Sequence, residues 1–379
     1  MFIINGVQKG WRASISNGYN SQGKLIRKQF YGKTQKEVRQ KLDAFKFARN
    51  NNTLPTDDKI SFEEWFFIWL FDYKQKELKP KSFQRYEGIY RNYIKCSSIG
   101  TIKLKDLKAT HLQHFYNDLL DIEERDVVTV RGINTRIKPC LEDALKQDYI
   151  QKNFAKLVNL PKDDRDREIQ ILSKEYQLKF TNAIKEHDLE LLFLMALGTG
   201  LRVGELLGLK WRDINFKTNT LFVKRTLQKV TLINKDNTRE SCIIEQEPKT
   251  KNSIREVNIP SNIMAKLKNY KVNQDNIKSK NENIYFDKDC VFCNKIGYLI
   301  EHKKPNRTLQ AILKKIDIKP IKFHALRHTF ASRLFESDVP PKTVQVMMGH
   351  GDISVTMNIY THVMPEVKQD ASERLNHLF

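Results

Sequence analysis

The sequence has no uninterrupted apolar run near the roughly 20 residues that a membrane-spanning helix needs, and its N-terminus lacks the pattern of a secretory leader. Cysteine is also scarce, with five residues in 379, scattered and odd in number, which is typical of reduced thiols in a cytosol. We therefore expect a soluble, cytoplasmic protein with no membrane partner.

One cysteine pair, Cys290-Val-Phe-Cys293, has the spacing of half a zinc site. A complete site would need two more ligands, for which His302 is the nearest candidate, and such spacing often occurs without a metal. No carboxylate cluster suited to magnesium accompanies the candidate catalytic residues described below. The sequence therefore predicts no metal and no cofactor.

The charge balance indicates a polyanionic partner. The chain has 66 Lys and Arg against 45 Asp and Glu, a formal net charge of +21. Such an excess points to nucleic acid ahead of an acidic membrane surface. A chain of 379 residues is also too long for one compact core, so two or three domains are expected.

Residues 1–50 are strongly basic, with eleven Lys or Arg against two acids. Alternation in residues 11–15 and 24–30 predicts strands, and Thr34 can cap a helix over about 35–49. A basic sheet backed by one helix can enter a DNA groove; the alternative is that the charge only solvates a small domain. The candidate DNA contacts here are Arg12, Lys24, Arg27 and Lys28.

A second, all-helical domain follows a polar, turn-rich linker at residues 50–58. The aromatic run at 62–71 would aggregate if exposed, so we place Trp65 and Trp69 in a core rather than against bases. Further helices are expected at 109–120 and 131–147. A helix opened by Pro80 presents a positive N-terminus, where the candidate phosphate contacts are Lys79, Lys81, Ser82 and Arg85.

The remaining part of the chain has a mixed pattern and begins after a charged linker at residues 161–168. It is expected to be mainly helical with a few strands. The predicted elements are a helix capped by Ser173, an apolar helix at 188–197, strands at 220–226 and 253–259 on either side of Lys249, and helices from 306 onward.

Six residues in this last part form an ordered set suited to phosphodiester chemistry: Arg202, Lys249, His324, Arg327, His350 and Tyr360. A guanidinium can grip two phosphate oxygens, and imidazoles and lysine can pass protons. A tyrosine, with a free pKa near 10, needs such a positive field to attack as a phenolate. Taken singly, each of these residues can be explained by packing or solvation. The ordered set of all six favours a catalytic role over those explanations.

The segments 199–206 (Thr-Gly-Leu-Arg-Val-Gly-Glu-Leu), 324–332 (His-Ala-Leu-Arg-His-Thr-Phe-Ala-Ser), 348–350 (Met-Gly-His) and 357–363 (Met-Asn-Ile-Tyr-Thr-His-Val) carry a family resemblance. They resemble the tyrosine recombinase (phage integrase) family. The resemblance implies a multidomain α+β fold. Its parts would be a β-sheet-plus-helix arm-binding domain at 1–52, an all-α SAM-like core-binding domain at 59–162, and a mixed, mainly α catalytic domain at 168–379.

The resemblance also implies a role for each site residue. Tyr360 would be the nucleophile that forms a 3′-phosphotyrosyl link, and Glu205 would orient its neighbours. Lys249 would protonate the 5′ oxygen, with Lys251 as the second candidate. The residues that would hold the scissile phosphate are Arg202, His324, Arg327 and His350. The sequence departs from the family pattern at Ala325, where an acid is common, and at Met348, where leucine is commoner.

The resemblance implies a site-specific integrase that exchanges DNA strands without ATP, as four protomers on two duplexes. Double-stranded core and arm sites, an excisionase and a host DNA-bending protein would be its partners, in the nucleoid of a bacterial host. Its C-terminal tail would dock on a neighbouring protomer, or else fold back on its own domain. The alternatives are a non-cutting DNA-binding regulator, a Xer-like resolvase and a type IB topoisomerase. The complete catalytic set argues against the regulator, and the basic N-terminal domain against the topoisomerase.

Overall fold

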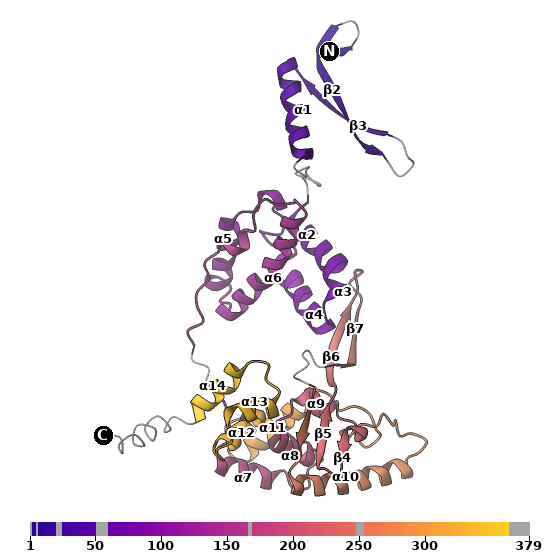
Figure 1. Cartoon of the computed structure of the whole chain (residues 1–379), viewed down its shortest axis with the longest axis vertical. Coiled ribbons are helices and arrows are strands. Elements are labelled where there is room, and N and C mark those ends of the chain that lie inside the picture. The colour runs from indigo at the N-terminus through magenta and orange to yellow at the C-terminus, as the bar shows by residue number, and fades with distance from the viewer. Residues whose placement is uncertain are drawn as a thin grey trace, which may run out of the picture. The chain divides into compact units, whose positions relative to one another are not determined.

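The computed structural model describes residues 2–4, 7–19, 25–50, 60–165, 169–247 and 254–363 (Figure 1). The chain divides into two compact units. The first comprises Met1–Asp164 with Ile233–Thr238, and the second Arg165–Leu232 with Arg239–Phe379. Among the described helices, none combines the length and the apolar character needed to cross a bilayer.

A three-stranded antiparallel sheet and one helix form the N-terminal part of the first unit. The strands are β1 (Phe2–Ile4), β2 (Val7–Tyr19) and β3 (Leu25–Gly32), followed by α1 (Gln35–Asn50). Thr34 Oγ1 accepts a hydrogen bond of 3.2 Å from the backbone N–H of Glu37, so it caps α1 as predicted. Val38 is buried on this helix. The predicted sheet and helix are confirmed.

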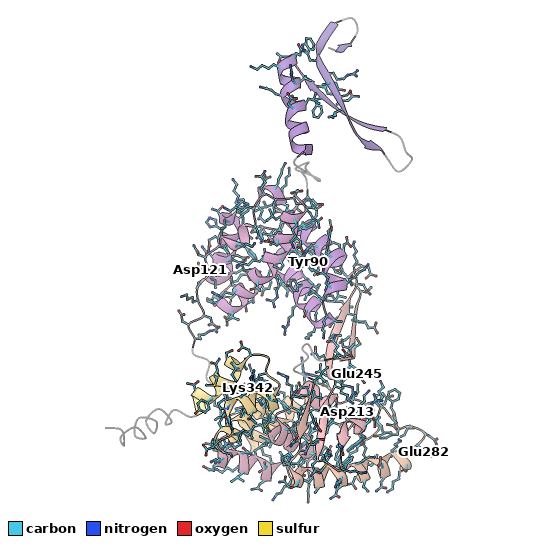
Figure 2. All side chains as sticks on the ribbon, in the orientation of Figure 1. Tyr90, Asp121, Asp213, Glu245, Glu282 and Lys342 are labelled. Atoms are coloured by element: carbon cyan, nitrogen blue, oxygen red, sulfur yellow. The ribbon has the colours of Figure 1, made fainter. Side chains whose placement is uncertain are left out.

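The rest of the first unit is helical. Its elements are α2 (Phe62–Ile68), the π-helical turn η1 (Trp69–Lys74), α3 (Gln75–Glu77), α4 (Pro80–Ile89), the π-helical turn η2 (Tyr90–Ile94), the 3₁₀ turns η3 (Leu104–Asp106) and η4 (Phe154–Lys156), α5 (Ala109–Asp121) and α6 (Val127–Lys146). Ser61 and Glu64 exchange hydrogen bonds in a capping box that starts α2. Tyr90, labelled in Figure 2, lies in this helical part.

The aromatic run forms the core of these helices. Trp65 is 1% exposed and Trp69 is fully buried. Their indole N–H groups donate to the carbonyl oxygen of Cys140 at 3.1 Å and to Asp143 Oδ2 at 2.8 Å, so neither polar edge is left unpaired. The interpretation of both tryptophans as core residues is confirmed. Ile233 belongs to the same core.

The second unit is mixed and mainly helical. Its helices are α7 (Lys174–Ala183), α8 (Glu190–Thr199), α9 (Val203–Leu207), η5 (Trp211–Asp213), α10 (Ser261–Lys280), α11 (Lys304–Lys315), α12 (His324–Phe335), α13 (Pro341–Met348) and α14 (Ile353–Val363). Ser173 caps α7 by accepting from the N–H of Tyr176 at 3.1 Å. The apolar helix α8 is buried in the core, and α10 and α12 pack against it (Figure 1).

The strands predicted at 220–226 and 253–259 are confirmed in part as β5 (Thr220–Val223) and β8 (Arg255–Asn258). They pair antiparallel beside β4 (Ile214–Asn215), with Leu221 opposite Val257. Two strands between them, β6 (Thr226–Ile233) and β7 (Arg239–Gln246), were not predicted. Among the described strands, they pair only with each other. The side chains of β7 are exposed or half-buried, so its sequence lacks the apolar alternation that marks a strand.

Candidate active site

The first candidate arginine lies at a turn between two helices. Helix α8 ends at Gly200, whose φ of +64° favours glycine, and α9 begins at Val203. Arg202 is therefore the N-cap residue of α9. Its backbone N–H donates to Glu205 Oε2 at 3.0 Å, and its Nη1 donates to Glu205 Oε1 at 2.8 Å. The Arg202 side chain remains 38% exposed, whereas that of Glu205 is 5% exposed.

Arg327, on α12, is buried, with 1% of its surface exposed. Its Nη1 donates to the carbonyl oxygen of Gly200 at 2.6 Å, and its Nη2 donates to that of Met348. Burial, and next the charge of Arg202, lowers the pKa of Arg327 to about 9. The guanidinium is therefore still protonated at neutral pH. One buried cation links two turns that are far apart in the sequence.

His324 opens helix α12 and packs against His328 one turn later. The two rings meet edge to face, with centroids 4.7 Å apart. Loss of water around the imidazole, and next the charges of His328 and Arg327, lowers the pKa of His324 to about 4. One side of His324 remains exposed to solvent. Its ring is therefore neutral at pH 7 and accessible from outside.

His350 follows a second left-handed glycine, Gly349, which has a φ of +64° at the end of α13. Its side chain is buried, and its Nδ1 shares a hydrogen bond of 2.9 Å with the hydroxyl of Thr356. Burial, and next the charges of Arg327 and Arg202, lowers the pKa of His350 to about 3. This second imidazole is therefore also neutral at pH 7.

Tyr360 is a half-buried residue of α14. Its ring meets that of Phe335 edge to face, with centroids 5.1 Å apart. Thr356, the partner of His350, lies four residues earlier, so the two side chains share one face of the helix. Helix α14 also packs against α12 and α13. The candidate nucleophile thus lies on a helix held against the two histidine-bearing segments.

The structure brings together four of the six candidate catalytic residues, Arg202, His324, Arg327 and His350, through mutual electrostatic influence, and it places Tyr360 on a helix that contacts His350. Arg202 and Arg327 both lower the pKa of each histidine. Thr356 connects His350 to the helix of Tyr360. The sixth candidate, Lys249, and the alternative Lys251 lie outside the described residues.

Glu205 organises the positive charge of this site. Burial on its own would raise its pKa, but the charges of Arg255 and Arg202 outweigh that effect and lower it. Arg255 Nη2 donates to Glu205 Oε2 at 3.2 Å. The carboxylate is therefore ionised between two guanidiniums, one exposed and one buried.

Three residues with contacts in the site were not identified from the sequence: Arg255, His328 and Thr356. For Arg255 a signal was present, because it shares the buried face of its strand with Val257, where an apolar residue is expected. Thr356 could be found from its position one helical turn before Tyr360. For His328, adjacency to Arg327 gave no indication of the ring contact with His324.

The candidate DNA contacts outside this site lie in the first unit. Lys79, Lys81 and Arg85 are exposed at the first turns of α4, and Ser82 is half-buried there. Arg12 is exposed on β2. Arg27 and Lys28 belong to β3, and Lys24 lies outside the described residues.

The cysteine pair belongs to a different network. Cys293 Sγ accepts a hydrogen bond of 2.7 Å from Gln274 Nε2 and lies 3.3 Å from the hydroxyl of Tyr285. Burial raises the pKa of the Cys290 thiol to about 11, so this thiol is protonated at neutral pH. Across the described ranges, no group of three or more His, Cys, Asp or Glu is arranged to hold a metal.

Comparison with known proteins identifies the family. The family model described as "Phage integrase family" matches residues 168–366, over half of the chain, and that of the "Phage integrase, N-terminal SAM-like domain" matches residues 61–120. A "Tyrosine recombinase XerC-like" protein of Caldanaerobacter subterraneus subsp. tengcongensis is 39% identical, over 100% of this chain and 98% of that protein. The chain belongs to the phage integrase family.

Other members share its length and fold. The ICEBs1 integrase of Bacillus subtilis is 22% identical, over 97% of each chain. The structure of the Tn1549 transposon integrase in complex with transposon right end DNA is similar, with a TM-score of 0.67 and 20% identity over 83% of this chain and 99% of that one. This family member therefore has the tyrosine recombinase fold, with a SAM-like domain and a catalytic domain.

Proposed function

We propose that this tyrosine recombinase cuts DNA with Tyr360 and stores the broken phosphodiester as a 3′-phosphotyrosyl ester, in order to integrate and excise a mobile element. The observation that carries the proposal is the arrangement around the turns at Gly200 and Gly349. There, Arg327 binds one carbonyl of each turn region, and both histidines lie within the field of Arg202 and Arg327. Such a concentration of positive charge and neutral imidazole suits a phosphodiester anion.

The proposed roles of these residues differ with the exposure of their side chains. Arg202 is half-buried and keeps part of its guanidinium accessible to phosphate oxygens, whereas Arg327 is buried against two carbonyls and supplies fixed charge. A Thr356 hydroxyl that donates to Nδ1 of His350 leaves the ring proton on Nε2, where it can be donated to a phosphate oxygen. His324 offers a second neutral imidazole.

In the cleavage step, the Tyr360 oxygen attacks phosphorus and loses its proton as the new P–O bond forms. The bond from phosphorus to the 5′ oxygen breaks, and that oxygen takes a proton from a general acid, for which we propose Lys249 or Lys251. Attack by a 5′ hydroxyl on the ester reverses these changes on a new partner strand. No energy-rich cosubstrate is needed, because each ester bond replaces another.

Strand cleavage can be tested with a nicked suicide duplex that carries the exchange site, incubated with the wild type and with Tyr360→Phe. We expect a covalent protein–DNA adduct with the wild type alone, because phenylalanine lacks the attacking oxygen. DNA binding by Tyr360→Phe, measured by gel shift, serves as the control. No adduct in either protein, with binding intact, would contradict the proposal and favour a DNA-binding regulator.

We further propose that four protomers act on two duplexes and that an excisionase and a host DNA-bending protein direct the reaction. Residues 1–52 would bind arm sites, and residues 59–162 would bind the core site. The basic N-terminal sheet and the exposed lysines and arginine of α4 support this division. Solved structures of similar proteins bound to core-site or transposon-end DNA support DNA as the partner.

A further inference from the structure

Arg255 is a buried charge that the proposed cleavage chemistry does not use. It begins β8, where it pairs with Val223 of β5, and its side chain is 7% exposed. A guanidinium in such a place loses its hydration and is stable only when fixed partners replace the lost water. The identity of those partners therefore indicates what the residue does.

Two partners of Arg255 among the described residues belong to separate parts of the candidate site. Nη2 donates to Glu205 Oε2 at 3.2 Å, and Glu205 in turn holds both the backbone and the guanidinium of Arg202. Nε donates at 3.0 Å to the carbonyl oxygen of Met347, near the end of α13. The last carbonyls of a helix have no partner within the helix and carry partial negative charge, so a cation is favoured there.

The turn that leads to His350 rests on the same side chain. A Cβ added to Gly349 would lie 2.9 Å from Cδ and 3.1 Å from Nε of Arg255, which is closer than ordinary packing allows. Arg327 takes the next carbonyl, that of Met348. Two arginines thus hold successive carbonyls just before His350, and only Arg255 also binds the carboxylate that orients Arg202.

We propose that Arg255 is a positioning residue for DNA strand cleavage, which fixes Arg202 through Glu205 and fixes His350 through the Met347–Gly349 turn. The inference rests on the proposed function, because its effect is on the transition state of that reaction. Arg255 does not touch the phosphate. It sets the distance between two groups that do, and a misplacement of about 1 Å in such groups slows a reaction by about 100-fold.

Arg255→Met tests this proposal because methionine fills the volume without the donors. In single-turnover cleavage of the suicide duplex at saturating DNA, we expect a rate about 10- to 100-fold below that of the wild type, with the dissociation constant for DNA little changed. Arg255→Lys keeps the charge but replaces the planar fork of donors with a single ammonium, which cannot reach both Glu205 and the Met347 carbonyl in the same way, so an intermediate rate is expected. This second variant also preserves the test if Arg255→Met does not fold.

A matched control is Arg225→Met. Arg225 is another shielded arginine of the same unit, bonded to Asp213, which Figure 2 labels, and to the carbonyl oxygen of Gly208. We expect it to lower the thermal midpoint while leaving the cleavage rate of the folded fraction unchanged. A double variant of Arg255→Met with Glu205→Gln then distinguishes a positioning effect on the cleavage rate from a loss of folding stability. If Arg255 acts through Glu205, the two substitutions are not independent. The fold-loss of cleavage rate in the double variant should then be much smaller than the product of the two single fold-losses.

Wild-type cleavage by Arg255→Met and Arg255→Lys would overturn the inference. So would a loss of rate that Arg225→Met also shows at a similar fall in the thermal midpoint. Both results leave the proposed function intact, since the wild type still forms the adduct. Failure of the wild type itself to form an adduct would instead count against the proposed function.

Discussion

At the scale of single residues, the site combines groups that normally repel one another. Burial of the two imidazoles, and next the charges of neighbouring groups that include Arg327 and Arg202, lowers the pKa of His324 to about 4 and that of His350 to about 3. Both rings are thus neutral in the protein without DNA. A phosphodiester brings a negative charge that offsets the guanidiniums, so the imidazoles become easier to protonate when DNA binds.

We therefore predict proton uptake on DNA binding in mildly acidic solution. The pKa of each histidine rises on binding, so between about pH 4 and pH 6 the complex holds more protons than its separate parts. Calorimetry of Tyr360→Phe with a core duplex, in two buffers of different ionisation enthalpy, measures this uptake. His350→Gln is the control and should reduce the uptake. Equal heats in both buffers would contradict the prediction.

The same lowered pKa values have a consequence for the stability of the free protein. An unfolded histidine takes up a proton near pH 6.5, while the folded rings resist protonation until about pH 4 and about pH 3. The free energy of unfolding is therefore fully supported above pH 6.5 and falls as the solution is acidified through this range.

At the scale of elements, helix α14 carries both the proposed nucleophile, Tyr360, and a contact to His350, a proposed phosphate-binding residue. The Thr356 hydroxyl is buried, and its bond to His350 Nδ1 spans six residues, across the turn that precedes the helix. This bond fixes the ring of His350 relative to the helix that presents Tyr360. An error in the orientation of α14 would therefore disturb two catalytic groups at once.

Thr356→Val removes this hydroxyl and keeps the shape of the side chain. We predict that cleavage slows by about 10- to 100-fold, because the imidazole loses the partner that sets its tautomer and orientation. DNA binding should change little. Thr356→Ser keeps the hydroxyl and should cleave close to the wild-type rate. Equal rates for the valine and serine variants in the suicide-duplex assay would refute this role.

The elements also show what the sequence can and cannot predict. Helices α1, α5, α6 and α8 agree with their predicted ranges to within a few residues, because apolar spacing decides a buried helical face. Strand β7 could not be predicted, because its side chains are polar and largely exposed. Its pairing with β6 depends on tertiary context rather than on a local pattern.

The site itself was predictable only in its residue types. Arginines, histidines and a tyrosine in a fixed order indicated phosphodiester chemistry, but the order says nothing about which carbonyls or carboxylates hold them. The bonds of Arg327 to Gly200 and Met348 span 127 and 21 residues, and that of Arg255 to Glu205 spans 50. Contacts of this range are set by the packing of α8, α12 and α13, which no local spacing rule describes.

At the scale of the whole molecule, the candidate DNA-binding residues outside the site all belong to the first compact unit, while the candidate catalytic residues all belong to the second. The net charge of +21 is spread along the chain, with a marked excess in the first 50 residues. Binding of each module to DNA should therefore depend on salt. We propose that the two modules of the first unit bind separate stretches of DNA.

Deletion of residues 1–52 should abolish binding to arm-site duplexes and leave weaker binding to core-site duplexes. The reason is that each module neutralises its own set of phosphates. Gel shifts on the two duplexes, at two salt concentrations, measure the effect. Arg12→Glu, which changes an exposed charge on β2, tests the same surface in the full chain and should weaken arm binding selectively. Parallel loss at both sites would argue against two separate modules.

Arg327 binds the carbonyl oxygen of Gly200, which is translated long before it, and that of Met348, which is translated shortly after it. The proposed phosphate site is therefore complete only after the segment to Met348 has emerged, and the proposed nucleophile follows twelve residues later. A nascent chain that already presents its basic N-terminal sheet has no means of breaking a strand. A nonsense mutation between Gly349 and Tyr360 would, on the same reasoning, give a product that occupies DNA without cutting it and competes with the intact enzyme in the same cell.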